Sequence, residues 1–546
     1  METFENIVGT LNDLVWSTPS YFPFMVAVLL SFGIFITLRL GFVQIRHFKH
    51  GILTVTGKFD HQDAIGDVNH FQALTTALSA TVGIGNIAGV AIAIHYGGPG
   101  ALFWMWVTAF FGMAVKYTEC TLAVKYRVQN SDGSVSGGPM YYIEKGLGEQ
   151  WKWLAIFFAA MAVICSFLTG NAVQANTVAD TMSSTFLIPG WITGLATATI
   201  VGFVIVGGIK RIGRVTASLM PIMALIYVFG ALIILLLNTD KVLPAFGIII
   251  EYAFTPKAGA FGVGSGLFLT TLVWGIKRGL FSNEAGQGSA PIAHGAAKTK
   301  EPVREGVVAL LEPFIDTLVV CTMTGLVIVS TGVWEQKHPT VFTSNAIEAS
   351  FEINDESNIL TISNGVPVNG EILRNDYSYG EFYTDMGREK LFSGQIVLLE
   401  SGTVTIKTLT GENLGELQTS IVENGAPLTA LAFEKGLSPL FSGGKYIVTI
   451  CVILFGVSTA ISWSYYGDRS IQYLAGDSSV IYYKIVYLVM HFLGAILALE
   501  TVWAIGDIAL GLMTFPNIIA LFALSGMVAK ATKTYFDSYK ANQGTE

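Results

Sequence analysis

The stretch from Ala80 to Val90 carries three glycines, a threonine and an asparagine inside an apolar segment long enough to cross a membrane. Each glycine lowers helix propensity by about 1 kcal/mol. Backbone that leaves a helix cannot face lipid, so a break here must be buried in protein or line a wet cavity. Exposed N–H groups at a half-helix N-terminus bind anions, and carbonyls at the other broken end suit a hard cation. Asn86, whose amide both donates and accepts, favours such a site.

A structural interpretation of the same stretch remains open. Gly85 and Gly89 form a G-x-x-x-G pair, which allows two membrane helices to approach closely.

Hydroxyl and amide side chains recur at midspan elsewhere. Ser458, Ser462 and Tyr465 lie near one helical face, with Thr459 beside them. Such hydroxyls either bond back to the preceding helical turn or, as a cluster, face the broken helix.

Asn171 and Gln174 are three residues apart and share a helical face. Their amides serve either as contacts between helices or as ligands. A charge at the bilayer centre costs about 2.5–3.5 kcal/mol on insertion scales. Asp316 is therefore expected to face a cavity or a partner. Its role would be in coupling or gating, or as one member of a structural pair. Glu312, nearer the end of its span, is expected to snorkel.

Composition sets the class of protein. The chain has 546 residues, of which 52% are hydrophobic and 13% charged, with a mean hydropathy of +0.56. Soluble domains carry about 25% charged residues, so this is a polytopic membrane protein. The first twenty residues lack Lys and Arg, so the first apolar run is expected to remain as a span rather than a cleaved signal peptide. The four cysteines are far apart and indicate neither disulfides nor a metal site.

Apolar runs of about twenty residues predict eleven transmembrane helices. Their expected ranges are 22–42, 73–95, 100–125, 153–175, 191–208, 217–237, 264–283, 306–332, 447–466, 480–499 and 505–529.

Most Lys and Arg residues, assigned to loops and span ends, fall on one side of this arrangement. The positive-inside rule then predicts an N-terminus outside the cell and a cytoplasmic C-terminus. The expected location is the cell (inner or plasma) membrane, with the lipid bilayer as a partner.

The segment 335–444 differs from the rest. It holds fifteen acidic and six basic residues, and Val, Ile and Thr alternate with polar residues around Ile359–Ile362 and Val404–Lys407. Asn-Gly pairs at Asn364 and Asn369 are hairpin signals. We expect a small acidic β-rich extracytoplasmic insertion, with a disordered linker as the alternative.

Spans two and seven, which start from opposite sides of the membrane, both contain several glycines. Interrupted segments at corresponding positions of two inverted halves indicate a transporter with a midplane site. The expected domains are an N-terminal extra helix (1–45), the first inverted repeat with the start of the second (46–334), the insertion (335–444) and the remainder of the second repeat (445–546).

Four motifs resemble signatures of the alanine or glycine:cation symporter family. They are GGPGALFWMWV at 97–107, GGPMYY at 137–142, GLFSNEAG at 279–286 and WSYYG at 463–467. The resemblance covers nearly all of the chain except 335–444, where the family usually has a short loop. It implies sodium- or proton-coupled uptake of small neutral amino acids. It also implies an all-α LeuT-type fold, the 5+5 inverted repeat of the neurotransmitter:sodium symporters, preceded by one extra helix.

The resemblance further implies a set of site residues. Backbone amides around Ile84 and Gly85 would receive the substrate carboxylate, Gln174 would hydrogen-bond the amino acid, and Trp463 would close the pocket. The other implied substrate-binding residues are Thr81, Thr271, Trp274, Gly275, Ile276 and Thr459. The implied sodium ligands are Ser79, Thr81, Val82, Asn86, Phe455, Ser458 and Thr459.

The sequence therefore predicts a sodium-coupled symporter that imports alanine or glycine by alternating access. It predicts no catalytic residues, no nucleic-acid partner and no cofactor apart from the coupling ion, Na⁺ or alternatively H⁺. Two other classes remain as alternatives. A channel would need repeated rings of charges or carbonyls along a pore, and a transceptor would sense a ligand through the outer domain.

Overall fold

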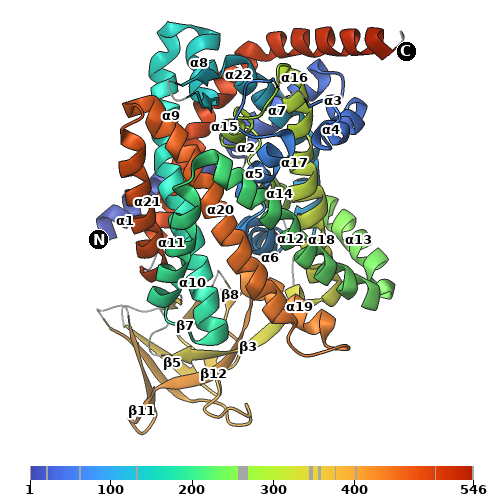
Figure 1. Cartoon of the computed structure of the whole chain (residues 1–546). Helices are drawn as coiled ribbons and strands as arrows, with labels where there is room; N and C mark the ends of the chain where they lie inside the picture. Colours follow the sequence, from blue (N-terminus) through green and yellow to red (C-terminus); the bar gives the residue numbers. More distant parts are fainter. Residues whose placement is uncertain are drawn as a thin grey trace.

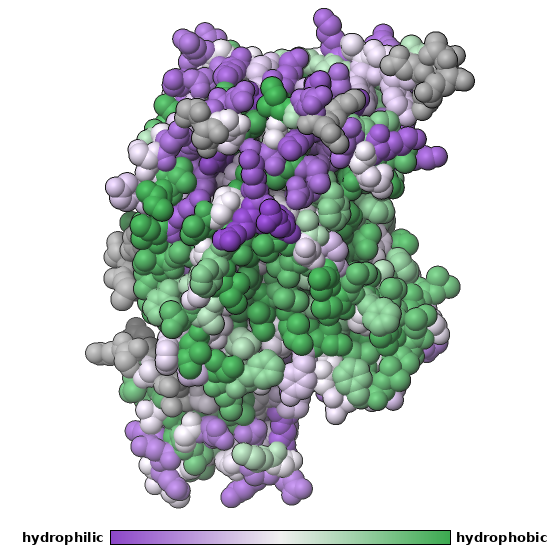
Figure 2. Space-filling view, in the orientation of Figure 1, coloured by the Kyte–Doolittle hydropathy of each residue, from purple (hydrophilic) through white to green (hydrophobic). Residues whose placement is uncertain are grey.

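The computed structural model describes residues 2–19, 22–60, 63–130, 133–255, 268–343, 349–353, 358–374, 377–399, 403–497 and 500–543. The helices form an upright bundle (Figure 1). Most strands gather at one end, which we call the β-domain end, and the last part of α22 lies across the opposite end (Figure 1). Figure 2 shows an apolar band around the middle, between two hydrophilic ends. This surface suits a multi-pass membrane protein, whose helices must present apolar side chains to lipid.

The helices of the first half of the chain have the following bounds: α1 (Glu2–Trp16), α2 (Phe24–Arg39), α3 (Val43–Arg46), α4 (Phe48–Val55), α5 (His70–Thr81), η1 (Gly85–Gly89), α6 (Val90–Gly97), α7 (Ala101–Tyr126), α8 (Pro139–Leu147), η2 (Glu149–Trp151), α9 (Lys152–Phe167), η3 (Leu168–Ala172), α10 (Val173–Phe186), α11 (Gly190–Ile205), α12 (Gly208–Leu237) and α13 (Thr239–Phe254). Those of the second half are α14 (Phe268–Asn283), α15 (Ala290–His294), α16 (Pro302–Ala309), α17 (Leu311–Pro313), η4 (Phe314–Cys321), α18 (Thr322–Thr331), η5 (Val333–Glu335), α19 (Gly425–Leu437), α20 (Gly444–Ala475), α21 (Ser479–Ile496) and α22 (Glu500–Gln543).

Each of the eleven expected spans contains helix, although residues 264–267 of the seventh lie outside the described residues. By length and hydropathy, six helical stretches of the described chain could each cross a membrane, and one bent pair would make a seventh. The count of eleven and the inverted repeat therefore remain predictions. Several helices outside these spans were not expected from the sequence, among them α1, α4, α8, α13 and α19.

The break in span two lies where the glycines predicted it. Asn69 begins α5 with a capping box to Gln72. The helix ends at Val82, whose ψ of 85° turns the chain out of the helical path. The chain re-enters a helix as the π-helical turn η1, continues as α6, and the two halves are bent by 53°. The side-chain oxygen of Asn86 accepts a hydrogen bond from the Gly83 N–H at 2.8 Å, which joins the break to the first turn of the second half.

The alternative role of Gly85 and Gly89 in close helix packing is wrong. A Cβ atom added at Gly89 would meet nothing within 4 Å, and one at Gly85 would lie 4.0 Å from Cα of Ser282.

Span seven differs from the prediction. The helix α14 runs without a break past its internal glycines. A Cβ at Gly275 would lie 2.4 Å from the carbonyl oxygen of Ala101, and one at Gly279 would lie 2.1 Å from Oγ1 of Thr108. These glycines let α14 pack closely on α7. The interruption comes after Asn283, where Glu284 has a φ of 54°, in the left-handed region.

Several basic residues assigned to loops or span ends lie inside helices. Lys116 is fully buried within α7, and Lys277 and Arg278 lie in α14. The orientation derived from the basic residues remains a prediction.

The 335–444 segment holds its own apolar core. The strands among its described residues are β3 (Lys337–Thr343), β4 (Ser350–Ile353), β5 (Ile359–Ser363), β6 (Val366–Pro367), β7 (Gly370–Arg374), β8 (Tyr377–Ser378), β9 (Gly394–Leu398), β10 (Val404–Thr408), β11 (Asn413–Leu414) and β12 (Glu416–Val422). They form sheets in the orders β11-β10-β9-β5-β6, β12-β3 and β4-β7-β8. We call this unit the β domain. The remaining pair, β1 (Val128–Gln129) and β2 (Val135–Ser136), lies between α7 and α8.

Of the two Asn-Gly hairpin signals, one forms a hairpin. Asn364 and Gly365 have φ of 47° and 79° and join β5 to its partner β6. Asn369 instead leads from β6 into β7, which belongs to another sheet. Its side chain bonds the backbone of Thr361 and Ile359.

Candidate ion and substrate site

The C-terminal end of α5 meets the middle of α20 at a cluster of oxygen atoms. Thr459 Oγ1 donates to the carbonyl oxygen of Ser79 at 3.1 Å, and Ser458 Oγ lies 3.5 Å from that same oxygen. Ser458 Oγ also lies 3.0 Å from the carbonyl oxygen of Phe455. These side chains are buried, and Ser79 Oγ has no hydrogen-bond partner among the described residues. The structure thus brings together Ser79, Phe455, Ser458 and Thr459, with Val82 at the adjacent helix end.

The break explains why these oxygens are available. The last carbonyls of a helix have no intrahelical partner, so ending α5 at Val82 frees the oxygens of its last turn. Neutral carbonyl and hydroxyl oxygens suit a hard cation of low charge. Among the described residues, no group of three or more His, Cys, Asp or Glu lies close enough together to hold a metal ion.

Two predicted ligands lie elsewhere. Thr81 Oγ1 bonds back to the carbonyls of Ala77 and Leu78 in its own helix, at 3.3 and 3.4 Å. The side-chain oxygen of Asn86 accepts from the Gly83 N–H, and its side-chain nitrogen donates to Asp316 Oδ1 at 2.6 Å.

Asp316 organises a second polar cluster beside the break. Its carboxylate accepts from Asn86, from Ser282 Oγ at 2.7 Å and from Thr317 Oγ1 at 2.7 Å. The expectation that Asp316 faces a partner is confirmed. Glu312 was expected to snorkel, and this is wrong: it is fully buried and pairs with Lys116.

Three of the predicted substrate-binding residues lie at α20: Trp463 belongs to it, and Ile84 and Gln174 lie beside Gly456. Trp463 is 2% exposed and lies on Gly170 of η3, because a Cβ added at Gly170 would be 2.4 Å from Cγ of the indole. Gln174 donates to the Thr169 carbonyl at 3.1 Å, while its buried side-chain oxygen has no partner among the described residues. That oxygen can accept a hydrogen bond from an ammonium group. The Cδ1 atom of Ile84 lies 3.6 Å from the position that a Cβ atom added at Gly456 of α20 would occupy.

Four predicted residues of α14 do not reach the break. Trp274 stacks on Tyr96 of α6 with ring centroids 4.6 Å apart. Thr271 lies against Gly97, and Gly275 against α7. Ile276 is fully buried, six residues before Ser282, or about 9 Å along a helix.

The α14 residue that does face the break is Ser282, which hydrogen-bonds Asn86, and its neighbour Asn283 contacts Thr317. Ser282 Oγ bonds Asp316, and Asn283 lies 3.4 Å from Thr317 Oγ1. Sequence reasoning missed both as site residues, although they lie inside the recognised motif GLFSNEAG.

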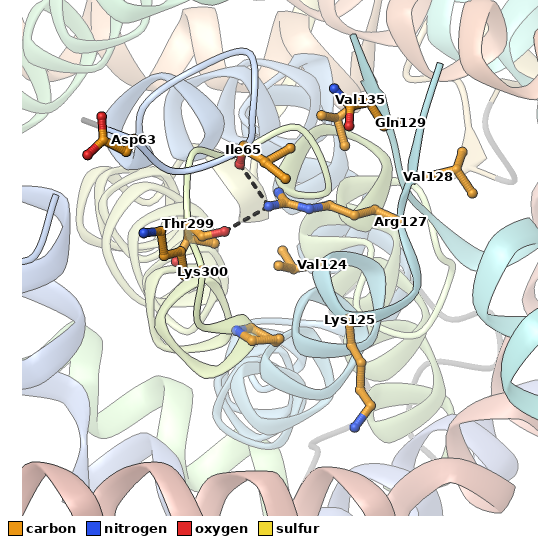
Figure 3. A pocket seen from close by; sticks show the side chains of 11 residues that line it. Asp63, Ile65, Val124, Lys125, Arg127, Val128, Gln129, Val135, Thr299 and Lys300 are labelled. Carbon is orange, nitrogen blue, oxygen red and sulfur yellow. Dashed lines mark hydrogen bonds between the residues drawn. The ribbon is translucent and has the colours of Figure 1, made fainter. Parts of the chain in front are cut away.

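Arg127 connects several loops by hydrogen bonds at the end of the bundle opposite the β domain. Arg127 donates to the carbonyl oxygens of Ile65 at 2.8 Å, Ala297 at 2.6 Å and Thr299 at 2.7 Å. Figure 3 shows its guanidinium between Ile65 and Thr299, beside a cavity of about 520 Å³.

Apolar helices around a broken helix, with free oxygens at the break, define a membrane transporter. The sequence profile of the sodium:alanine symporter family matches residues 1–381 and 394–546, and the chain belongs to that family. The family consists of transporters rather than enzymes. The chain is therefore a multi-pass membrane protein and an amino-acid:cation symporter.

Three relatives illustrate the range of the family. The sodium/alanine symporter AgcS of Methanococcus maripaludis is 40% identical over 97% of both chains. A Bacillus subtilis protein named as a sodium/proton-dependent alanine carrier, YrbD, is 34% identical over 97% of this chain and 92% of its own. A third, the Bacillus subtilis protein GlnT, named as a sodium/glutamine symporter, is 30% identical over 99% of this chain and 93% of its own.

Proposed function

We propose that this protein imports small neutral amino acids, alanine or glycine, together with Na⁺ by alternating access. The observation that carries the proposal is the oxygen cluster between α5 and α20. There Thr459 Oγ1 lies 3.1 Å from the Ser79 carbonyl oxygen. The ion would exchange its hydration shell for these oxygens, and the break that frees them also presents N–H groups at the start of η1.

The substrate would bind across the same break. Its carboxylate would accept from the backbone around Ile84 and Gly85, as expected for the free N–H groups at the start of a helix. Its ammonium group would donate to the free oxygen of Gln174, and Trp463 would limit the side chain. The name of AgcS supports alanine as the first substrate to test.

The ion gradient would supply the driving force. One Na⁺ entering across about 100 mV contributes about 2.3 kcal/mol, and a tenfold gradient adds about 1.4 kcal/mol. Together these energies allow roughly 500-fold accumulation of substrate. In the cell the protein would lie in the inner or plasma membrane, with the N-terminus outside and the C-terminus in the cytoplasm.

The test is uptake of labelled alanine by the purified protein in liposomes. We expect accumulation when Na⁺ is high outside and little uptake when K⁺ replaces Na⁺ on both sides. Liposomes without protein are the control. Equal accumulation with and without a sodium gradient would contradict sodium coupling.

A further inference from the structure

A second buried network lies between the break and the end of the bundle opposite the β domain. It joins residues from five separate parts of the chain, which we call the relay residues: Asp60, His70, Glu305, His294, Glu312 and Lys116. Only Asp60 reaches the surface, with a side chain that is 45% exposed. The other five side chains are at most 1% exposed.

The first half of the network runs from the surface to the interior. His70 turns Nε2 toward Asp60 Oδ1 at 3.9 Å and hydrogen-bonds Glu305 Oε2 through Nδ1. The second oxygen of Glu305, Oε1, lies 2.6 Å from Nδ1 of His294.

The second half continues in the same way. His294 Nε2 faces Glu312 Oε2 at 3.6 Å, and Glu312 Oε1 accepts from Lys116 Nζ at 2.9 Å. Each inner residue therefore meets its two neighbours through two different atoms, as a path for protons requires.

A fixed ion-pair network would satisfy all its buried atoms, and this one does not. Among the described residues, His70 Nε2, His294 Nε2 and Glu312 Oε2 have no hydrogen-bond partner. The gaps of 3.9 and 3.6 Å beside these atoms exceed a direct hydrogen bond. Buried polar atoms left unpaired are costly, so these two gaps are places where a proton or a bridging water would be stabilised.

The charges also leave the position of one proton open. Glu305 and Glu312 carry two negative charges against one positive charge on Lys116, and burying an unbalanced charge is costly. One additional proton balances them, and either His70 or His294 can hold it. The other titratable groups around the network are Arg304 near His70, Arg127 near Glu305, Asp316 near Glu312, and Glu119, Glu284, Cys120 and Tyr466 around Lys116 and Glu312.

The network is attached to the broken helix. His70 is the first residue of α5, the half-helix whose other end carries Ser79 in the oxygen cluster. Nine residues separate them, which is about 14 Å along a helix. A change of charge at His70 therefore acts on the element that supplies carbonyl oxygens to the proposed ion site.

We propose that the relay residues form a proton path, open at Asp60, and that each transport cycle exchanges a proton with the solution at that end of the molecule. A proton from solution binds His70 Nε2, and the proton on Nδ1 passes to Glu305 Oε2. After the Glu305 carboxyl group turns about its terminal bond, its proton passes to His294 Nδ1. His294 then gives the proton on Nε2 to Glu312 Oε2. The step moves one proton inward and neutralises one carboxylate, and the reverse transfers return the proton to the same solution before the next cycle.

The test uses the full-length protein in liposomes, with labelled alanine as the transported probe. This design rests on the proposed function. In wild type, the sodium-driven uptake of alanine should vary with pH between about 5.5 and 8.5, where histidine titrates. Glu305→Gln and His294→Gln should remove most of this pH dependence, as expected when a proton-transfer group is removed.

Two further variants control for folding and for location. Asp60→Asn changes an exposed side chain, so it should fold normally and still reduce the pH dependence of uptake. His47→Gln should behave as wild type. His47 lies in the connection between α3 and α4 and stacks on Phe536, outside the relay.

The outcomes separate the two proposals. Sodium-driven alanine uptake that is independent of pH would overturn the relay and leave the proposed function standing. If alanine is not taken up with Na⁺, the proposed function fails, and the relay is judged by the rate at which the purified protein takes up protons after a jump from about pH 8.5 to about pH 5.5. Slower proton uptake in Asp60→Asn than in wild type would support the relay, and equal rates would overturn it.

Discussion

Thr459 Oγ1 donates to the carbonyl oxygen of Ser79 at 3.1 Å and thereby joins the middle of α20 to the end of α5. The same hydroxyl lies 2.7 Å from where a Cβ at Gly83 would be. The Thr459 hydroxyl therefore lies at the break itself, and its removal would change the set of oxygens around a bound ion.

Thr459→Ala should weaken the dependence of alanine binding on Na⁺ more than it weakens folding. Alanine removes an oxygen ligand without adding bulk, so substrate affinity should fall at limiting Na⁺ and recover as Na⁺ rises, because coupled ligands affect each other reciprocally. Alanine binding across a sodium titration, with thermal stability alongside, checks this. Thr459→Ser keeps the oxygen and should stay near wild type. An unmoved sodium midpoint in folded Thr459→Ala would remove Thr459 from the ligands.

Gly170→Ala should abolish most transport. The added methyl group would lie 2.4 Å from the Trp463 ring, and overpacking of this kind costs about 1–3 kcal/mol or displaces the ring. We expect uptake to fall about tenfold or more, measured in liposomes at equal protein content. Gly89→Ala is the matched control, because an added Cβ there meets nothing within 4 Å. Equal loss in both variants would show that the Trp463 contact is not the cause.

Short side chains should be preferred as substrates. Trp463 lies directly on Gly170, and Ile84 borders the same region, so little room remains beside the break. One extra methylene in a tight apolar pocket is worth about 1–3 kcal/mol. Competition against labelled alanine measures the preference, and glycine and serine should compete far better than leucine or phenylalanine. Strong competition by leucine would refute this description of the pocket.

A cysteine at Ser363 should be labelled in intact cells by a membrane-impermeant maleimide. Ser363 is an exposed residue of β5, and the four native cysteines are buried, so background labelling should be low. Lys125→Cys, exposed at the opposite end of the bundle, is the control and should react only after permeabilisation. The reverse pattern would invert the predicted topology.

Acid should destabilise the end of the bundle opposite the β domain. Burial, with nearby arginines, lowers the pKa of His47 and of His50 from 6.5 to about 4. Because the unfolded chain binds these protons more readily, their contribution is fully present above pH 6.5 and is lost as pH falls toward 4. The midpoint of thermal unfolding should fall through this range, and less so in His47→Gln/His50→Gln. Identical pH profiles would contradict the assignment.

The sequence predicted features that depend on local patterns. The break at Val82 follows from glycines in an apolar run, and strands β5 and β10 follow from alternation. The break in the second interrupted helix was misplaced, because Gly275 and Gly279 serve packing on α7, and a packing glycine looks the same in sequence as one that ends a helix.

Features that depend on distant residues were not predicted. Lys116 and Glu312 are 196 positions apart, and nothing local indicates that each neutralises the other. Without a partner, Lys116 had to be placed at a span end and Glu312 had to snorkel. The site residues Ser282 and Asn283 were missed for the same reason, since only their contacts with Asp316 and Thr317 distinguish them.

The β domain is connected to the broken helix by a short route. Only Glu423 and Asn424 separate β12 from α19, and Thr429 of α19 donates to the carbonyl oxygen of Ile87 in η1 at 2.9 Å. A binding protein that clamps the β domain against the bundle would therefore also hold α19, and with it the second half of the broken helix. We therefore expect that an antibody fragment bound to the β domain would arrest the transport cycle. It would do so without entering the bilayer or the pocket.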